Sequence, residues 1–196
     1  MGKLYIAYGS NLCKRQMRMR CPGARPVGKF VLTKAKLVFR GVADVEYDPN
    51  SSVPCGLWMI TAEDERKLDS YEGVNSGTYY KEESIVLRYQ GKPQNALIYL
   101  MNSGEEIHPP SQHYAEIIRK GYKDFGLDET FLDAALRHSF EQKNPGPQTL
   151  RRRERQRNNW QHRELARVAE TPKVVEPVKE PLKLIDKIVL GKFVRY

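Results

Sequence analysis

The N-terminal stretch reads Leu4-Tyr5-Ile6-Ala7-Tyr8-Gly9-Ser10-Asn11-Leu12 and passes from apolar residues to small polar ones. We expect a β-strand from Lys3 to Tyr8, because these residues are rich in β-forming side chains. A strand that stops at a glycine and continues into small polar residues presents successive backbone N–H groups outward, which is how proteins hold anionic groups. An ordinary turn is the alternative, since Gly, Ser and Asn are all common in turns. The stretch therefore predicts a first strand that leads into either a turn or a ligand-binding loop.

Further strands and turns follow, and helices come after them. Expected strands cover residues 29–39, 55–60, 78–89 and 95–101, the last two joined by the turn Gln90-Gly91-Lys92-Pro93. Expected helices cover residues 62–70 after the N-cap Thr61, residues from Ser111 to Gly126, and a third segment capped by Asp128. This order predicts an α+β domain with a mainly antiparallel sheet or small β-barrel, and excludes a doubly wound fold.

The composition predicts a soluble, cytoplasmic protein without a metal. The chain has 196 residues, of which 40% are hydrophobic, so it can form one domain plus an appendage. The start of the chain lacks a signal-peptide pattern, and no apolar run reaches the roughly 20 residues that a membrane helix needs. The three cysteines lack C-x-x-C spacing and the four histidines lack metal-ligand spacing.

The positive charge of the chain is concentrated at its C-terminal end. The net charge is +9, and residues 151–196 contain 13 Lys and Arg against 6 Asp and Glu. We therefore expect a main domain over residues 1–148 and an extension over residues 149–196. The extension divides into an Arg-rich helical segment, a spacer with three prolines, and an apolar terminal segment.

The partners of this extension are open at the level of sequence. For the Arg-rich segment we favour a solvated helix over contact with RNA or another acidic surface. The terminal segment after Pro181 is too apolar to remain in water, so it should dock on the sheet of its own chain or on a partner subunit, as in a homodimer.

A second informative stretch reads Leu68-Asp69-Ser70-Tyr71-Glu72-Gly73-Val74. Glu72 stands at the expected end of a helix, against a glycine and beside apolar and aromatic neighbours. Such surroundings can raise the pKa of a carboxyl group and make it a general base. The alternative is that Glu72 simply faces water, as most glutamates at helix ends do.

Taken together, these segments resemble the gamma-glutamylcyclotransferase family. The segments that carry the resemblance are Tyr8-Gly9-Ser10-Asn11-Leu12, Tyr71-Glu72-Gly73-Val74, Ser76-Gly77 with Tyr79, Tyr99-Leu100-Met101, and Pro109-Pro110-Ser111 with Tyr114. They span about residues 3 to 125. The resemblance implies a small mixed barrel with flanking helices and a pocket at one end, lined by the first loop and the glutamate.

The resemblance also implies roles for particular residues. The loop Tyr8-Gly9-Ser10-Asn11-Leu12 would hold the alpha end of a gamma-glutamyl group, and Glu72 would transfer the proton. Tyr99 and Tyr114 are candidates for contacting the substrate, although each could equally be a core aromatic residue. Tyr5 and Tyr79 are expected to serve packing.

The implied reaction is a cofactor-free cyclisation that releases 5-oxoproline from a small gamma-glutamyl compound. Residues 40–42 and 46–50 contain no motif, so the sequence leaves the departing amine open. Gamma-glutamyl amino acids or other gamma-glutamyl amines are favoured over gamma-glutamyl-epsilon-lysine links, because the relative that cleaves those links normally has threonine where Ser10 stands. A binding module with the same fold, whose basic tail engages nucleic acid or a protein, is the alternative from another functional class.

Overall fold

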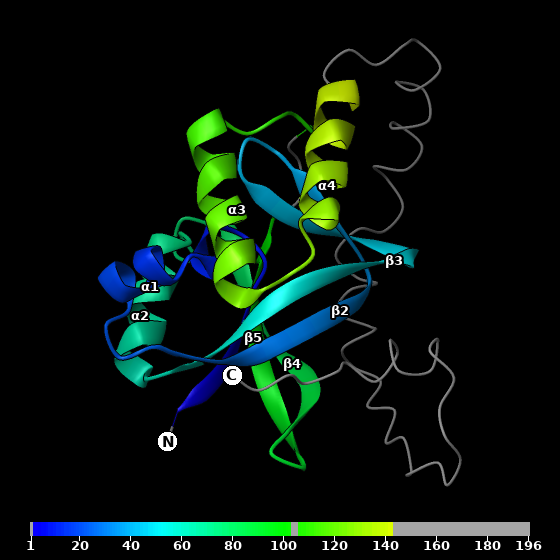
Figure 1. Ribbon diagram of the computed structural model, residues 1–196. Helices are drawn as coiled ribbons and strands as arrows, with labels where there is room; N and C mark the ends of the chain where they lie inside the picture. The colour runs from blue at the N-terminus through cyan, green and yellow to red at the C-terminus, as the bar shows by residue number, and fades with distance from the viewer. Residues whose placement is uncertain (1, 103–105, 143–196) are drawn as a thin grey trace, which may run out of the picture.

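Strand β1 (Lys3–Ala7) lies in the middle of a five-stranded sheet with the order β2-β3-β1-β5-β4. The structure is a computed structural model that describes residues 2–102 and 106–142 (Figure 1). β1 runs antiparallel to β3 and parallel to β5, so the sheet is mixed. Four of the five β1 residues are buried, as in a central strand that is covered on both faces. The expected strand is confirmed, and it ends one residue before Tyr8.

Strands β2 (Arg25–Phe39) and β3 (Ala43–Ile60) form a long antiparallel hairpin. Gly41 has a φ of 78° in the connection between them, which glycine adopts without steric cost. The sequence predicted only residues 29–39 and 55–60. It missed the remainder because Pro26, the Asp48-Pro49-Asn50 segment and Pro54 are typical of turns. Pro26 and Pro54 pair across the hairpin all the same, with a register shift after Pro26. Residues 48–51 have no partner on β2, at the register shift between Thr33 and Ala35, and there Asp48 accepts from the N–H of Asn50.

Strands β4 (Tyr79–Tyr89) and β5 (Lys92–Met101) form the second antiparallel hairpin, as predicted. Its connection is Gln90-Gly91, and both residues have positive φ, as a two-residue hairpin turn requires. Pro93 belongs to β5 although proline has no N–H to donate. The pairing of β5 with β1 begins only at Ala96, so Pro93 is not needed for that ladder.

The helices confirm the α+β class. Helix α2 (Ala62–Tyr71) begins with a capping box between Thr61 and Asp64. Helix α3 (Gln112–Phe125) begins after the N-cap Ser111 and ends at the left-handed Gly126, and α4 (Glu129–Gln142) follows it. The short helices η1 (Ser10–Leu12) and α1 (Lys14–Arg20) were not predicted. Of the α1 residues only Met17 is fully buried, so the segment has no apolar periodicity to signal a helix.

The predicted extension, residues 149–196, and its boundary with the main domain lie outside the described residues. Among the helices of residues 2–102 and 106–142, none is sufficiently long and apolar to cross a membrane.

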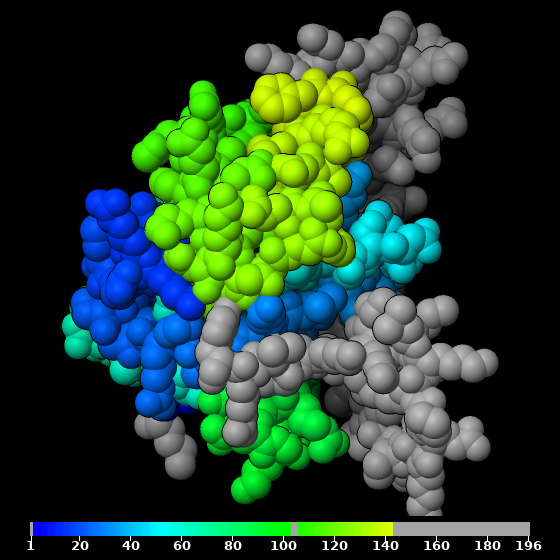
Figure 2. Space-filling model, viewed as in Figure 1, coloured from blue at the N-terminus to red at the C-terminus, as the bar shows by residue number. Residues whose placement is uncertain are grey.

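Helix α3 fixes the position of the loop that follows β1. Figure 2 shows the side chains of α3 and α4 as a continuous layer beside the blue N-terminal segment. A Cβ atom on Gly121 of α3 would stand 2.7 Å from the backbone nitrogen of Cys13. Leu12, which is fully buried, also lies against this position. The loop therefore packs directly on the backbone of α3, and only glycine permits this approach.

We predict that Gly121→Ala destabilises the protein. Replacing glycine by alanine inside a helix normally stabilises it by up to about 1 kcal/mol. Here the added methyl group meets backbone atoms, so we expect a loss of about 1–3 kcal/mol in the free energy of unfolding, measured with urea. Lys123→Ala, at an exposed position of the same helix, should change that free energy by less than about 0.5 kcal/mol. A stabilised Gly121→Ala variant would contradict the close packing.

Candidate active site

A small pocket opens where β1, β3, β4, β5, α2 and α3 present their ends. It is lined by Tyr8, Gly9, Ser10, Asn11, Ala43, Glu72, Tyr79, Tyr99 and Tyr114. The pocket holds about 290 Å³ of empty space, including the part open to solvent. The enclosed part of this space is only about 30 Å³, so the pocket is narrow and open to solvent.

Glu72 and the loop after β1 meet directly in this pocket. The side-chain Nδ2 of Asn11 donates a hydrogen bond of 2.7 Å to Oε1 of Glu72, across 61 residues of sequence. The same nitrogen donates to the hydroxyl of Tyr5 at 2.7 Å. No hydrogen bond to Oε2 of Glu72 is formed within the described residues. That oxygen is therefore available to a ligand.

The loop reaches this position because Gly9 passes close to two neighbours. A Cβ atom at Gly9 would stand 3.2 Å from Cβ of Ala43 and 3.5 Å from the hydroxyl of Tyr114. After Gly9 the chain makes the helical turn η1, and the N–H groups at the start of such a turn have no acceptor within it. The backbone of Gly9, Ser10 and Asn11 thus supplies donors at the pocket wall.

Glu72 has the electrostatic character of an acid/base group. It follows α2 as its C-cap, and its N–H donates to the carbonyl of Leu68. Burial raises the pKa of Glu72 to about 7, against the hydrogen bond from Asn11 and the charge of Arg20, which both lower it. A carboxyl group with this pKa exists in both protonation states near neutral pH, so it can accept a proton and return it.

Three of the four tyrosines that line the pocket donate their hydroxyl protons to the protein. Tyr8 donates to the carbonyl of Tyr99 at 2.7 Å, Tyr79 to the carbonyl of Ala43 at 3.0 Å, and Tyr99 to Asp69 at 2.7 Å. The hydroxyl of Tyr114 instead accepts a hydrogen bond of 3.2 Å from the N–H of Ala43. Tyr114 is therefore the lining tyrosine whose proton is best placed for donation to a ligand.

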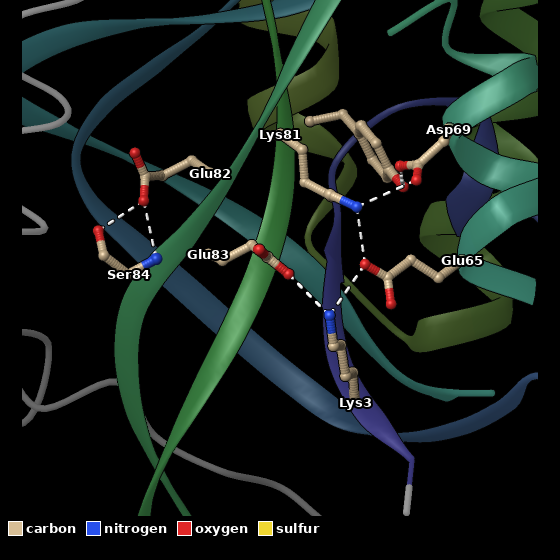
Figure 3. A network of polar contacts seen from close by, with 8 residues as sticks. Lys3, Glu65, Asp69, Lys81, Glu82, Glu83 and Ser84 are labelled. Atoms are coloured by element: carbon tan, nitrogen blue, oxygen red, sulfur yellow. Dashed lines mark hydrogen bonds and ion pairs between the residues drawn. The ribbon is translucent and has the colours of Figure 1, made fainter. Parts of the chain in front are cut away.

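A network of ion pairs includes Asp69, Lys81, Glu65 and Lys3 (Figure 3). Nζ of Lys81 lies 2.7 Å from Glu65 and 3.0 Å from Asp69, the residue that accepts from Tyr99. Lys3 joins the same network, at 3.0 Å from Glu65 and 2.8 Å from Glu83. The network holds Asp69 in place, and Asp69 in turn accepts the hydroxyl proton of Tyr99.

The wall at Ala43 is held by a buried ion pair. Asp44, the next residue, lies 3.1 Å from Nε of Arg40 and accepts a hydrogen bond of 3.3 Å from the N–H of Met101. Arg40 also pairs with Glu46. Burial raises the pKa of Asp44 to about 6 in spite of this arginine. Arg40 and Glu46, which belong to the two segments without a motif, thus brace the Ala43 wall.

The pocket brings together most of the residues that the sequence singled out. These are Tyr8, Gly9, Ser10, Asn11, Glu72, Tyr99 and Tyr114. Leu12 lies apart from the lining, because its side chain is fully buried in the core. Tyr79 is buried in the core, as its expected packing role requires, and it also lines the pocket.

Three further hydrogen bonds of the site escaped the sequence analysis. Arg20 donates to Ser10 and Asn11, and the hydroxyl of Tyr5 accepts from Asn11. Arg20 is one of several cations in a short helix, so nothing in the sequence distinguishes it from its neighbours. Within residues 2–102 and 106–142, His, Cys, Asp and Glu side chains form no group of three that could hold a metal ion.

The chain is similar in sequence to one family model and to known proteins. Residues 52–134 match the AIG2-like family. A gamma-glutamylcyclotransferase from Homo sapiens is 34% identical over 136 residues, which are 63% of this chain and 72% of the relative. A gamma-glutamylcyclotransferase from Mus musculus is 31% identical over 142 residues, which are 66% of this chain and 75% of the relative.

The fold is also similar to solved structures. A structure titled gamma-glutamyl cyclotransferase superposes with a TM-score of 0.61 at 26% identity, and the match covers 87% of this chain and 99% of that chain. An uncharacterized protein from Homo sapiens superposes with a TM-score of 0.59 at 25% identity, over 87% of this chain and 99% of that one.

We predict that Glu72→Gln stabilises the folded protein above neutral pH. Between about pH 4.5 and 7 the unfolded state loses the proton of Glu72 while the folded state keeps it, so the wild type becomes less stable as pH rises through this window. Glutamine removes this penalty and can still accept from Asn11. We expect a gain of about 1–2 kcal/mol at pH 8 and little change at pH 4, measured by urea unfolding.

The matched control is Glu63→Gln on the same helix. The pKa of Glu63 is lowered by its exposed pair with Lys67, so the linkage has the opposite sign and is weak. Equal stability of wild type and Glu72→Gln at pH 8 would show that Glu72 is ionised without penalty.

Proposed function

This chain belongs to the gamma-glutamylcyclotransferase family, and we propose that its pocket cyclises a gamma-glutamyl compound to 5-oxoproline and a free amine or amino acid. The observation that carries this proposal is the 2.7 Å hydrogen bond between Asn11 and Glu72. It places a carboxyl group with a pKa of about 7 beside a loop rich in backbone donors.

The reaction requires a bent substrate and a carrier for protons. The alpha-nitrogen of the gamma-glutamyl group attacks its own gamma-carbonyl carbon, and a five-membered lactam closes. The bond from that carbon to the departing nitrogen then breaks. The alpha-nitrogen begins as an ammonium and gives up two protons, while the departing nitrogen takes up two and leaves as an ammonium. A single carboxyl group can carry these protons in turn.

In this proposal Glu72 carries the protons through Oε2. Its Oε1 accepts from Asn11, which leaves Oε2 to face the substrate nitrogen. The backbone donors of Gly9, Ser10 and Asn11 hold the alpha-carboxylate of the substrate, since backbone N–H groups form strong hydrogen bonds with carboxylates. Binding both ends of the gamma-glutamyl group in a small pocket brings the nitrogen and the carbonyl carbon together.

Tyr114 stabilises the negative charge that develops on the gamma-carbonyl oxygen. Its hydroxyl accepts from the N–H of Ala43, so its own proton can point to that oxygen. Burial raises the pKa of Tyr114, which keeps the hydroxyl protonated at neutral pH. A fixed donor in a pocket with little water contributes more to stabilising an oxyanion than it would in bulk water.

We predict that the protein releases 5-oxoproline from gamma-glutamyl-alanine or from simple gamma-glutamyl amines. Because Glu72 must be ionised to accept the first proton, kcat/KM should rise with pH through about 7. Glu72→Gln should reduce kcat by about 10²–10⁴-fold. Product release is followed chromatographically, and the folded state of the variant is checked by its unfolding curve.

The controls separate this activity from the alternatives. Glu63→Gln changes an exposed glutamate of the same helix and should retain wild-type turnover. Full turnover by Glu72→Gln would refute the assignment. Absence of turnover by the wild type on all gamma-glutamyl substrates would favour a binding module with the same fold.

We predict different effects for two phenylalanine variants of the lining tyrosines. Tyr114→Phe removes the donor to the oxyanion and should lower kcat by about 10²-fold with little change in KM. Tyr99→Phe removes a hydroxyl that donates to Asp69, so the loss should be about 10-fold at most. Steady-state kinetics on one substrate measures both. An equal loss in the two variants would argue against a direct role of the Tyr114 proton.

A further inference from the structure

Arg20, the last residue of α1, contacts both segments that carry the polar groups of the pocket. Its Nη1 donates to Oγ of Ser10 at 3.0 Å and to Oδ1 of Asn11 at 2.6 Å. Its guanidinium also lies 3.8 Å from the ring centroid of Tyr71, the residue before Glu72. One side chain thus links the loop after β1 to the end of α2.

These contacts determine which way the amide of Asn11 faces. Arginine can only donate hydrogen bonds, so the Asn11 atom that faces Arg20 must be the oxygen. The nitrogen is therefore turned to the hydroxyl of Tyr5 and to Oε1 of Glu72, at 2.7 Å from each. The reversed amide would place its nitrogen against the guanidinium and its oxygen against the carboxylate of Glu72, and both contacts are unfavourable.

Arg20 also provides the positive charge that acts on Glu72. The other titratable groups that interact with Glu72 come from β1, the loop after it, the residue that follows α1, β4 and α3. They are Tyr5, Tyr8, Cys21, Tyr79 and Tyr114. Burial raises the pKa of each, so all are neutral at neutral pH. Among the described residues, Arg20 is the charged group that opposes the effect of burial on the pKa of Glu72.

We propose that Arg20 is a positioning residue, which orients the amide of Asn11 and thereby sets the placement and ionisation of Glu72. This inference rests on the proposed function for its kinetic consequences. The proposed role of Arg20 has two parts. One is a geometric effect, which acts through Asn11 and Tyr71, and the other is an effect of charge, which acts on Glu72 directly.

Two substitutions separate these effects, and a third serves as the matched control. Arg20→Gln removes the charge together with the planar donor group. Arg20→Lys keeps the charge but loses the planar group that stacks on Tyr71. Arg18→Gln removes the same charge from an exposed position of the same helix.

The expected results differ among the three variants. Arg20→Gln should lower kcat by about 10–100-fold and shift the acid limb of the kcat/KM profile upward by about one pH unit. Arg20→Lys should lower kcat, while the acid limb of the kcat/KM profile should remain at the pH of the wild type. Arg18→Gln should match the wild type in both respects.

A measurement without turnover tests the same inference. The carboxyl carbon of Glu72 is followed by ¹³C NMR during a pH titration of the full chain, with Glu72→Gln used to assign the signal. Its midpoint should move upward in Arg20→Gln and remain in place in Arg18→Gln. A wild type that titrates this way but releases no 5-oxoproline would overturn the proposed function and not the role of Arg20.

Two outcomes would overturn the role of Arg20. One is an Arg20→Gln variant whose acid limb and NMR midpoint equal those of the wild type. The other is an Arg18→Gln variant that shifts them equally, since that would make the effect one of general charge. If Arg20→Gln does not fold, Arg20→Lys decides, because wild-type kcat in that variant contradicts the geometric effect.

Discussion

Strand β1 joins the two hairpins into one sheet, and the rest of the structure depends on that pairing. On one side all five of its residues pair with β3. On the other side Leu4 and Tyr5 pair with Ala96 and Leu97 of β5. Backbone hydrogen bonds on both sides leave β1 no freedom to slide, because a shift of one residue would turn its buried side chains to the opposite face. The loop after β1 therefore emerges at a fixed place among the strand ends.

The chemical character of the pocket follows from what surrounds that place. Three of the tyrosines that line it donate their hydroxyl protons to backbone carbonyls and to Asp69, so this part of the wall is polar but uncharged. In such surroundings the ionised form of Glu72 is disfavoured, and the Asn11 hydrogen bond and the Arg20 charge only partly restore it. A pKa near 7 is the balance of these opposing effects, and it belongs to the assembled pocket as a whole.

Local patterns in the sequence were sufficient for the elements that have a clear start and stop. The β4–β5 hairpin is an example, because its turn contains a glycine between two apolar strands, and α2 and α3 are others, because Thr61 and Ser111 are good N-caps. The first half of β3 was not predicted, since its Asp48-Pro49-Asn50 segment favours turns. Residues 48–51 have no partner on β2, and residues 43–47 resume the pairing on the other side of them. Helix α1 could not be predicted from the sequence either, because contacts with residues outside the helix hold it in place.

The sequence by itself determined that a strand leads into a loop of small polar residues, and that a glutamate stands at the end of a later helix. Both are local properties, fixed by side-chain size, backbone preference and helix capping. Only the tertiary structure decided that Nδ2 of Asn11 lies 2.7 Å from Oε1 of Glu72 and that Arg20 orients the side-chain amide of Asn11. It also decided that Tyr79 lines the pocket and Leu12 does not. The reason is physical: proximity and desolvation arise from segments that are distant in the chain, and no local pattern records them.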